Sequence, residues 1–186
     1  MERREAVKYI SLLLGGTLVG ANAFLTGCRS EEGKAMAFTQ DDIAYLDEVA
    51  ETILPTTSTP GARAAKVGQF MTVMVNDCYT EADQKVFHEG MDKINKASEQ
   101  KFDKGFMKLT PQQRHELLVQ LDGEQKEHQK NKKKEDPSHY FRMMKELTLL
   151  GYFTSEIGSK QARRYVPVPG RFEGCIPYNK GDKAFA

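Results

Sequence analysis

The sequence has 186 residues, of which 39% are hydrophobic and 28% are charged, and its formal net charge at neutral pH is +1. This length and composition suit one globular domain with a real core. The balanced charge gives no reason to expect a nucleic-acid-binding surface.

Residues 1–27 have the pattern of an export signal. Arg3, Arg4 and Lys8 precede residues 9–25, which carry no charge and are rich in Leu, Gly, Ala and Val. This run is too short and too Gly-rich for a transmembrane helix, which needs about 20 strongly apolar residues. It ends in Leu-Thr-Gly-Cys, the pattern of a bacterial lipobox, whose cysteine takes up a diacylglycerol. We therefore expect an exported chain that begins at Cys28 and is lipid-anchored on the periplasmic side of the membrane or in the cell envelope. The alternative is an uncleaved N-terminal anchor with an incidental cysteine.

The Arg3-Arg4 pair indicates twin-arginine export, a route that carries proteins already folded. Ala6 stands where phenylalanine is common in that consensus, and an ordinary signal can contain two arginines by chance. Residues 28–37 are expected to form a flexible tether. Removing the three basic and two acidic residues of positions 1–27 leaves 24 of each sign, so the mature chain is charge-balanced.

Two cysteines remain once Cys28 is assigned to the lipid. An even pair in an oxidising compartment predicts a disulfide between Cys78 and Cys175. The bond would close a loop of about 98 residues, which stabilises a fold by on the order of 4 kcal/mol. The alternative is two buried free thiols.

Residues 38–160 are expected to form a single all-α bundle of about five helices. Thr39, Thr80 and Thr110 are placed to cap helices, Ser138 to begin the last one, and a further helix is expected over residues 62–78. Apolar residues recur at helical spacing and are expected to form the core. They are Ile43, Leu46, Val49, Ala50, Ile53, Val67, Phe70, Met71, Met74, Cys78, Val86, Phe87, Met91, Ile94, Ala97, Leu117, Leu118, Leu121, Tyr140, Phe141, Met144, Leu147 and Leu150.

The last part of the chain, residues 161–186, is expected to be an extended Pro-rich arm. The run YVPVPG at residues 165–170 is incompatible with a helix, because each proline lacks an N–H and forces its predecessor into an extended conformation.

The residue patterns of known catalytic and cofactor sites do not occur in the sequence. There is no C-x-x-C or C-x-x-C-H, and the only Gly cluster lies in the export signal with the wrong spacing for a dinucleotide-binding loop. The four histidines lack metal-ligand spacing. We therefore expect no catalytic, cofactor-binding or metal-binding residues in this chain. A small enzyme with an unrecognised site is the weakest alternative.

Three segments together resemble the gluconate 2-dehydrogenase subunit 3 family. The first is ETILPTTSTPGA at residues 51–62, followed by VGQF at 67–70. The others are GYFTSEIG at 151–158 and YVPVPGRFEGC at 165–175. The resemblance covers roughly residues 38–178.

The resemblance implies a small, non-catalytic subunit of an oxidoreductase complex. Its partner in that family is a large FAD-containing dehydrogenase of the glucose–methanol–choline type, often joined by a c-type cytochrome. FAD and haem c are thus expected in partner subunits. The small subunit commonly bears the twin-arginine signal and carries the flavoprotein across the membrane with it. Related complexes oxidise gluconate, glucose or glycosides. A lipobox departs from the simplest family pattern and moves the anchor onto this subunit.

A Pro-rich arm is suited to lying along a partner, because proline lowers the entropy lost on ordering. The residues expected at the dehydrogenase interface are Tyr152, Phe153, Tyr165, Val166, Pro167, Val168, Pro169, Arg171 and Phe172. The alternative is an arm folded back on its own bundle through Cys78 and Cys175. The alternative function is a free-standing lipoprotein that binds a ligand or an envelope partner.

Overall fold

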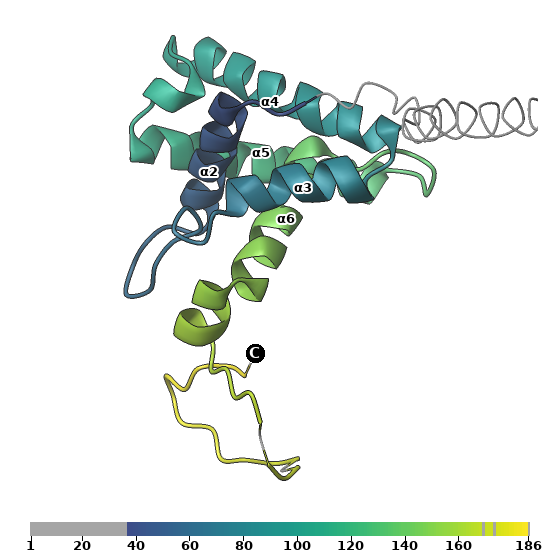
Figure 1. Cartoon of the computed structure of the whole chain (residues 1–186). Helices are drawn as coiled ribbons and strands as arrows, with labels where there is room; N and C mark the ends of the chain where they lie inside the picture. The colour runs from purple at the N-terminus through teal and green to yellow at the C-terminus, as the bar shows by residue number, and fades with distance from the viewer. Residues whose placement is uncertain (1–36, 169, 173, 186) are drawn as a thin grey trace, which may run out of the picture. The chain divides into compact units, whose positions relative to one another are not determined.

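The structure is a computed structural model that describes residues 37–186 except 169, 173 and 186. The predicted export signal, with Arg3 and Arg4, and the lipidation site Cys28 lie outside the described residues. Within them the fold is all-α, as predicted (Figure 1). The elements are α2 (Gln40–Ile53), α3 (Val67–Cys78), α4 (Glu81–Phe102), the 3₁₀-helix η1 (Phe106–Lys108), α5 (Pro111–Asn131), α6 (Tyr140–Thr154) and the π-helical turn η2 (Gly158–Ala162).

Local capping residues start three of the five α-helices where the sequence predicts. Thr39 and Thr110 each take part in a complete capping box, in which the threonine side chain and the third helical residue satisfy each other's free N–H groups. Thr80 caps α4 in the simpler way, by accepting from one backbone N–H. The cap of α6 is His139 rather than Ser138, so the predicted start was wrong by one residue.

The helix predicted over residues 62–78 begins later, at Val67. Lys66 before it has a left-handed backbone conformation with φ 54°, and its side chain makes no capping bond. The acceptor comes instead from the neighbouring helix α2, where Asp47 Oδ1 accepts from the Gly68 N–H at 2.7 Å. Burial raises the pKa of that carboxyl above its ordinary value. A tertiary contact therefore sets the start of α3.

The core contains residues from all five α-helices and from η1. Its largest fully buried side chains include Phe87 of α4, Phe106 of η1 and Phe141 of α6. Two residues that the helical pattern predicts in the core are exposed instead. Cys78 is the last residue of α3, and Leu150 lies on the outer side of α6 with 46% of its surface exposed.

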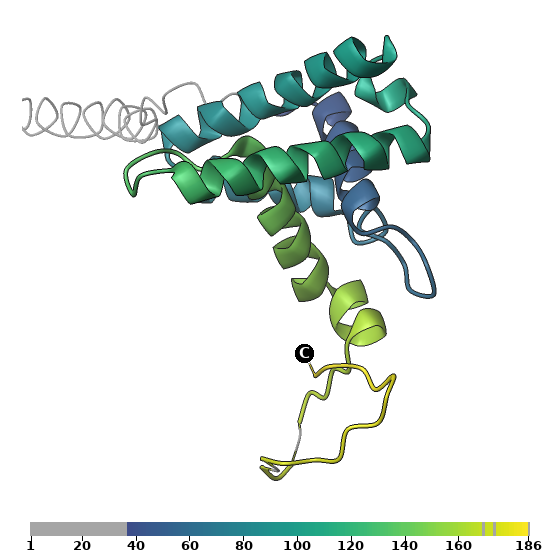
Figure 2. The same ribbon diagram turned by 180° about the vertical axis from the view of Figure 1, so that it is seen from behind.

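Helix α6 contacts all four of the other α-helices. Its C-terminal part extends away from them, as two opposite views show (Figure 1 and Figure 2). The chain then continues through η2 into residues 163–185, where the described residues form no helix and only one isolated bridge. No described helix is long and apolar enough to span a membrane.

Candidate functional site

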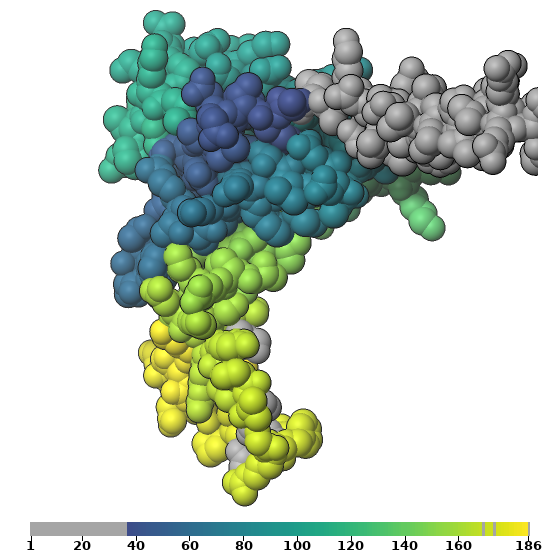
Figure 3. Space-filling view, viewed as in Figure 1, coloured from purple at the N-terminus to yellow at the C-terminus, as the bar shows by residue number. Residues whose placement is uncertain are grey.

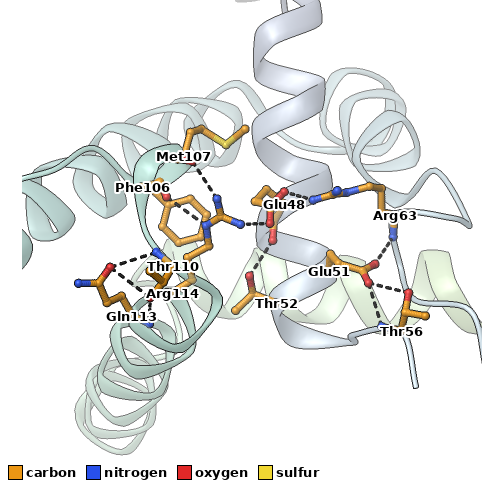
Figure 4. Close-up of polar contacts among 10 residues, drawn as sticks. All are labelled: Glu48, Glu51, Thr52, Thr56, Arg63, Phe106, Met107, Thr110, Gln113 and Arg114. Carbon is orange, nitrogen blue, oxygen red and sulfur yellow. Dashed lines mark hydrogen bonds and ion pairs between the residues drawn. The ribbon is translucent and has the colours of Figure 1, made fainter. Parts of the chain in front are cut away.

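A polar cluster joins α2, the loop after it and the start of α5 (Figure 4). The Glu48 carboxylate of α2 pairs with two guanidinium groups, those of Arg63 and Arg114. Arg114 also donates to the carbonyl oxygens of Phe106, at 3.2 Å, and Met107, at 2.8 Å. Burial, followed by the nearby positive charge of Arg63, lowers the pKa of Arg114. One carboxylate thus holds three segments of the chain together.

A second carboxylate, that of Glu51, fixes the loop at residues 54–66. It accepts from the backbone N–H groups of Thr56, at 2.8 Å, and Arg63, at 2.9 Å, and from the Thr56 hydroxyl at 2.8 Å. Gly61 packs so closely on this carboxylate that a Cβ there would lie 2.3 Å from its Oε2 atom. The Glu51 side chain therefore occupies the space that any larger residue at position 61 would need.

The C-terminal motif GYFTSEIG reaches the same loop. The Tyr152 hydroxyl donates to the Pro60 carbonyl oxygen at 2.7 Å. Next to it, Gly151 lies against the Phe70 ring of α3, where a Cβ would be 2.5 Å from a ring carbon. Two of the motifs that are far apart in sequence therefore form one structural unit, with Tyr152 almost fully buried inside it.

Beside the Glu48 cluster lies a groove of about 560 Å³, lined in part by Glu51, Thr56, Arg63 and His115. Most of the polar atoms that line it already bind each other. Elsewhere in the described chain, no group of three or more His, Cys, Asp or Glu side chains is arranged to hold a metal ion. The fold does bring His128 and His139 together, with ring centroids 5.5 Å apart, a pair that the sequence spacing did not predict.

The model of the gluconate 2-dehydrogenase subunit 3 family matches residues 40–170, which include both motifs joined by the Tyr152–Pro60 bond. The chain belongs to the gluconate 2-dehydrogenase subunit 3 family. The resemblance noted in the sequence is thereby confirmed, and the family is that of a subunit of an oxidoreductase complex. No curated protein and no solved structure matches the chain.

The predicted interface residues of this subunit 3 chain differ in their exposure. Tyr152 is only 4% exposed and its hydroxyl is engaged within the fold, so its assignment to the partner interface needs correction. Phe153 is half-buried beneath the Arg163 guanidinium, which lies 4.9 Å from its ring centroid. The others that the structure describes are exposed: Tyr165, Val166, Pro167, Val168, Arg171 and Phe172. Pro169 lies outside the described residues.

The arm folds back on itself at its base. The Arg164 N–H donates to the Ala184 carbonyl oxygen at 2.8 Å, and the Arg164 guanidinium lies 4.8 Å from the Phe185 ring centroid. The Lys183 ammonium also donates to the Gln161 carbonyl oxygen. Residues 164–185 therefore form a loop closed at its ends, beyond the C-terminal end of α6 (Figure 3).

The predicted Cys78–Cys175 disulfide is absent, and the alternative of buried thiols is also wrong, because both thiols are free and exposed. Cys78 is the last residue of α3, and Cys175 lies in the arm that follows η2. An even cysteine count in an exported chain favours a disulfide but does not determine where the two cysteines lie in the fold.

The sequence did not predict the Glu48 cluster. Its two arginines follow Glu48 by 15 and 66 residues, so no short motif contains them. A Glu-x-x-Glu spacing on a capped helix is by itself the pattern of an ordinary solvated helix face.

Proposed function

We propose that this chain is the non-catalytic small subunit of an exported, membrane-bound dehydrogenase complex. It binds a large FAD-containing subunit of the glucose–methanol–choline type, which oxidises a sugar or sugar acid. The family match over residues 40–170 carries the proposal. A c-type cytochrome with haem c completes the complex as electron acceptor.

The exposed arm supports a partner-binding role. Phe172 is 96% exposed, Val168 is 81% exposed and Tyr178 is 75% exposed. Scattered apolar side chains are ordinary on a protein surface, but several large ones gathered on one loop mark an interaction site. Prolines in the same loop limit its freedom before binding, which lowers the entropic cost of ordering it on a partner.

The N-terminal residues complete the proposal. Arg3 and Arg4 direct the folded chain and its bound flavoprotein to the twin-arginine route, which accepts folded cargo. Cys28 then carries the lipid that anchors the complex on the periplasmic side of the membrane. The subunit thus assists folding, export and anchoring of a catalytic partner.

The test is a gentle purification of the tagged full-length chain from membranes of its native host. The expected result is a co-purifying larger chain with flavin absorbance and dye-linked oxidation of a sugar or sugar acid. A lone colourless chain contradicts the proposal and favours a free-standing lipoprotein of the cell envelope. Oxidation by the lone chain contradicts its non-catalytic role.

Deleting residues 164–186 tests the arm itself. The shortened chain is expected to keep its helical circular dichroism spectrum, because no described residue of the arm belongs to the buried core. It is expected to lose the flavoprotein in the same purification. Recovery of the complex at full yield contradicts an interface role for the arm.

A further inference from the structure

Two histidines meet where α5 ends and α6 begins. His128 lies in the last turn of α5, and His139 is the cap of α6. Their ring centroids are 5.5 Å apart, and the His139 ring also stacks on the Tyr140 ring with a centroid distance of 4.3 Å. The His128 Nδ1 atom is buried without a hydrogen-bond partner in the described part of the chain. Among the described side chains, no carboxylate forms an ion pair with either imidazole.

The start of α6 depends on a neutral His139. Its Nδ1 atom accepts from the Phe141 N–H at 3.2 Å, and its carbonyl oxygen accepts from the Met143 N–H at 3.2 Å. A protonated imidazole carries a proton on both nitrogens, so Nδ1 can no longer accept. A positive charge at this position is also unfavourable, because the N-terminal end of a helix is itself positive. Protonation of His139 therefore removes the capping hydrogen bond and adds a repulsion.

Charged and titratable groups on three helices act on His139. Burial lowers its pKa most, and the charges of His128 on α5 and Lys93 on α4 act in the same direction, whereas Glu124 on α5 raises it. The Lys93 ammonium lies 5.6 Å from the Tyr140 ring centroid. Burial, followed by the charge of Glu124, raises the pKa of Tyr140 to about 12, so its hydroxyl carries no charge at neutral or acidic pH. A proton on His139 is thus opposed by Lys93 and by a protonated His128.

The connection between α5 and α6 has few attachments besides the two helix ends. The described hydrogen bonds of residues 132–138 stay within the connection or reach the last turn of α5. By contrast, Tyr140 is only 8% exposed and packs on Gly90 of α4, where an added Cβ would lie 2.5 Å from the Tyr140 Cβ. The connection and the first turn of α6 can therefore open while the body of α6 stays packed.

We propose that His128 and His139 form a pH-sensitive switch, which keeps the connection between α5 and α6 closed while both are neutral and opens it when they are protonated. The two protonation steps are coupled, because positive charges on neighbouring rings repel each other. Histidine clusters act in this way in proteins that respond to pH 5–6. The inference goes beyond the proposed function and does not depend on it, since the opening takes place within this chain.

The first test is amide hydrogen exchange of the full-length chain at pH 7 and pH 5, compared as protection factors. The closed state binds a proton on His139 less readily than the open state, so closure weakens as the pH falls below 6.5. The amides of Phe141 and Met143 are expected to lose about tenfold or more of their protection at pH 5. Those of α3 are expected to keep theirs. Equal losses in all helices would indicate global unfolding and contradict a local switch.

Variants of His139 separate its protonation from other effects of acid. H139N and H139D keep an oxygen that can cap α6 but cannot become positive, so both are expected to retain the protection of the Phe141 amide at pH 5. H115N, at an exposed histidine, is the matched control and should lose protection as the original chain does. A loss in H139N and H139D as large as in the original overturns the inference. Helical circular dichroism at pH 7 shows that each variant is folded.

The second test measures the coupling between the two rings. Titration of the histidine ring protons by NMR gives the pKa of His139 in the original chain and in H128N. The substitution removes a positive neighbour, so the pKa of His139 is expected to rise. H115N is again the control and is expected to leave it unchanged. A pKa of His139 that is the same in H128N as in the original overturns the coupled switch.

Discussion

Glu48 satisfies two arginines from different parts of the chain. Its side chain is 16% exposed and that of Arg114 is 12% exposed, whereas the Arg63 side chain is 53% exposed. Removing one member of a largely buried ion pair costs more than the pair itself contributes, because the remaining charge is left without compensation. Arg114 is the residue that would bear this cost.

The substitution E48Q is expected to lower the free energy of unfolding by about 2 kcal/mol, because the amide keeps the shape but not the charge. Urea unfolding followed by circular dichroism measures it. The matched control is E89Q, at an exposed carboxylate that pairs only with neighbours on its own helix. The control is expected to change stability by less than about 0.5 kcal/mol. Equal effects of the two would show that the cluster does not stabilise the fold.

His139 is a titratable residue at a helix start. Its Nδ1 accepts from the Phe141 N–H at 3.2 Å, which only the neutral imidazole can do at that atom. Burial, then the charge of His128, lowers the pKa of His139 below the ordinary 6.5, and Lys93 acts in the same direction. Glu124 opposes them. The unfolded chain therefore binds a proton on this residue at a higher pH than the folded chain does.

The contribution of His139 to stability is expected to be fully present above pH 6.5 and to be lost as the pH falls through its lowered pKa. H139N can still cap the helix but cannot titrate, so it is expected to flatten the decline in unfolding free energy between pH 7 and 5. Thermal melts across this range measure it. H115N, at an exposed histidine, is the control and should follow the original chain. A decline as steep in H139N as in the original would show that protonation of His139 does not cause it.

At the scale of elements, the contact between α3 and α6 depends on a residue without a side chain. G151A is expected to destabilise the protein by about 1–3 kcal/mol, because its Cβ would overlap the Phe70 ring. G123A is the matched control, since Gly123 also lies within a helix but a Cβ there meets nothing within 4 Å. It is expected to stabilise by about 0.5–1 kcal/mol through helix propensity. Stabilisation by both substitutions would contradict close packing at Gly151.

The elements that sequence predicts well are those whose signals are local. The capping patterns of Thr39, Thr80 and Thr110 lie within three residues, and each starts a helix where expected. The start of α3 was predicted wrongly because its acceptor, Asp47, is 21 residues away. Phe106 was missed because a three-residue helix has no periodic pattern to show its buried face.

The contacts of the candidate site were harder still to predict, because they join residues that are far apart in the sequence. The hydrogen bond from Tyr152 to Pro60 joins residues that are 92 positions apart. The sequence therefore showed both motifs but not the contact between them. Tyr152 was therefore predicted at the partner interface while it stabilises the loop instead. The prolines of residues 165–170 exclude a helix interior, and the described residues of that run form no helix. The closure of the arm at Arg164 and Phe185 depends on a cation–aromatic contact that no motif records.

At the scale of the whole molecule, the proposal divides the chain among three tasks. In the proposed complex, the N-terminal residues would supply the export signal and the lipid, the helical domain a stable body, and the arm exposed apolar surface. A subunit with this division can anchor a partner without sharing in its chemistry. The division predicts that the anchor can be removed while the complex remains.

The substitution C28S removes the thiol that carries the lipid in the proposed function. Acyl chains bind membranes with about 0.8 kcal/mol per buried CH₂, so C28S removes the binding energy of the proposed anchor. The chain and the flavoprotein are therefore expected to move together from the membrane to the soluble fraction, with sugar oxidation retained. Fractionation followed by flavin absorbance and dye reduction measures both. C175S, at an exposed thiol of the arm, is the control and should remain in the membrane.

Flavoprotein that stays in the membrane while C28S is released contradicts anchoring by this subunit, because the partner then holds its own membrane contact. Release of C28S without the flavoprotein bound to it would separate anchoring from partner binding. Retention of C28S itself would show that the N-terminal segment is uncleaved and holds the chain without a lipid. Each outcome places the membrane anchor on a different part of the complex.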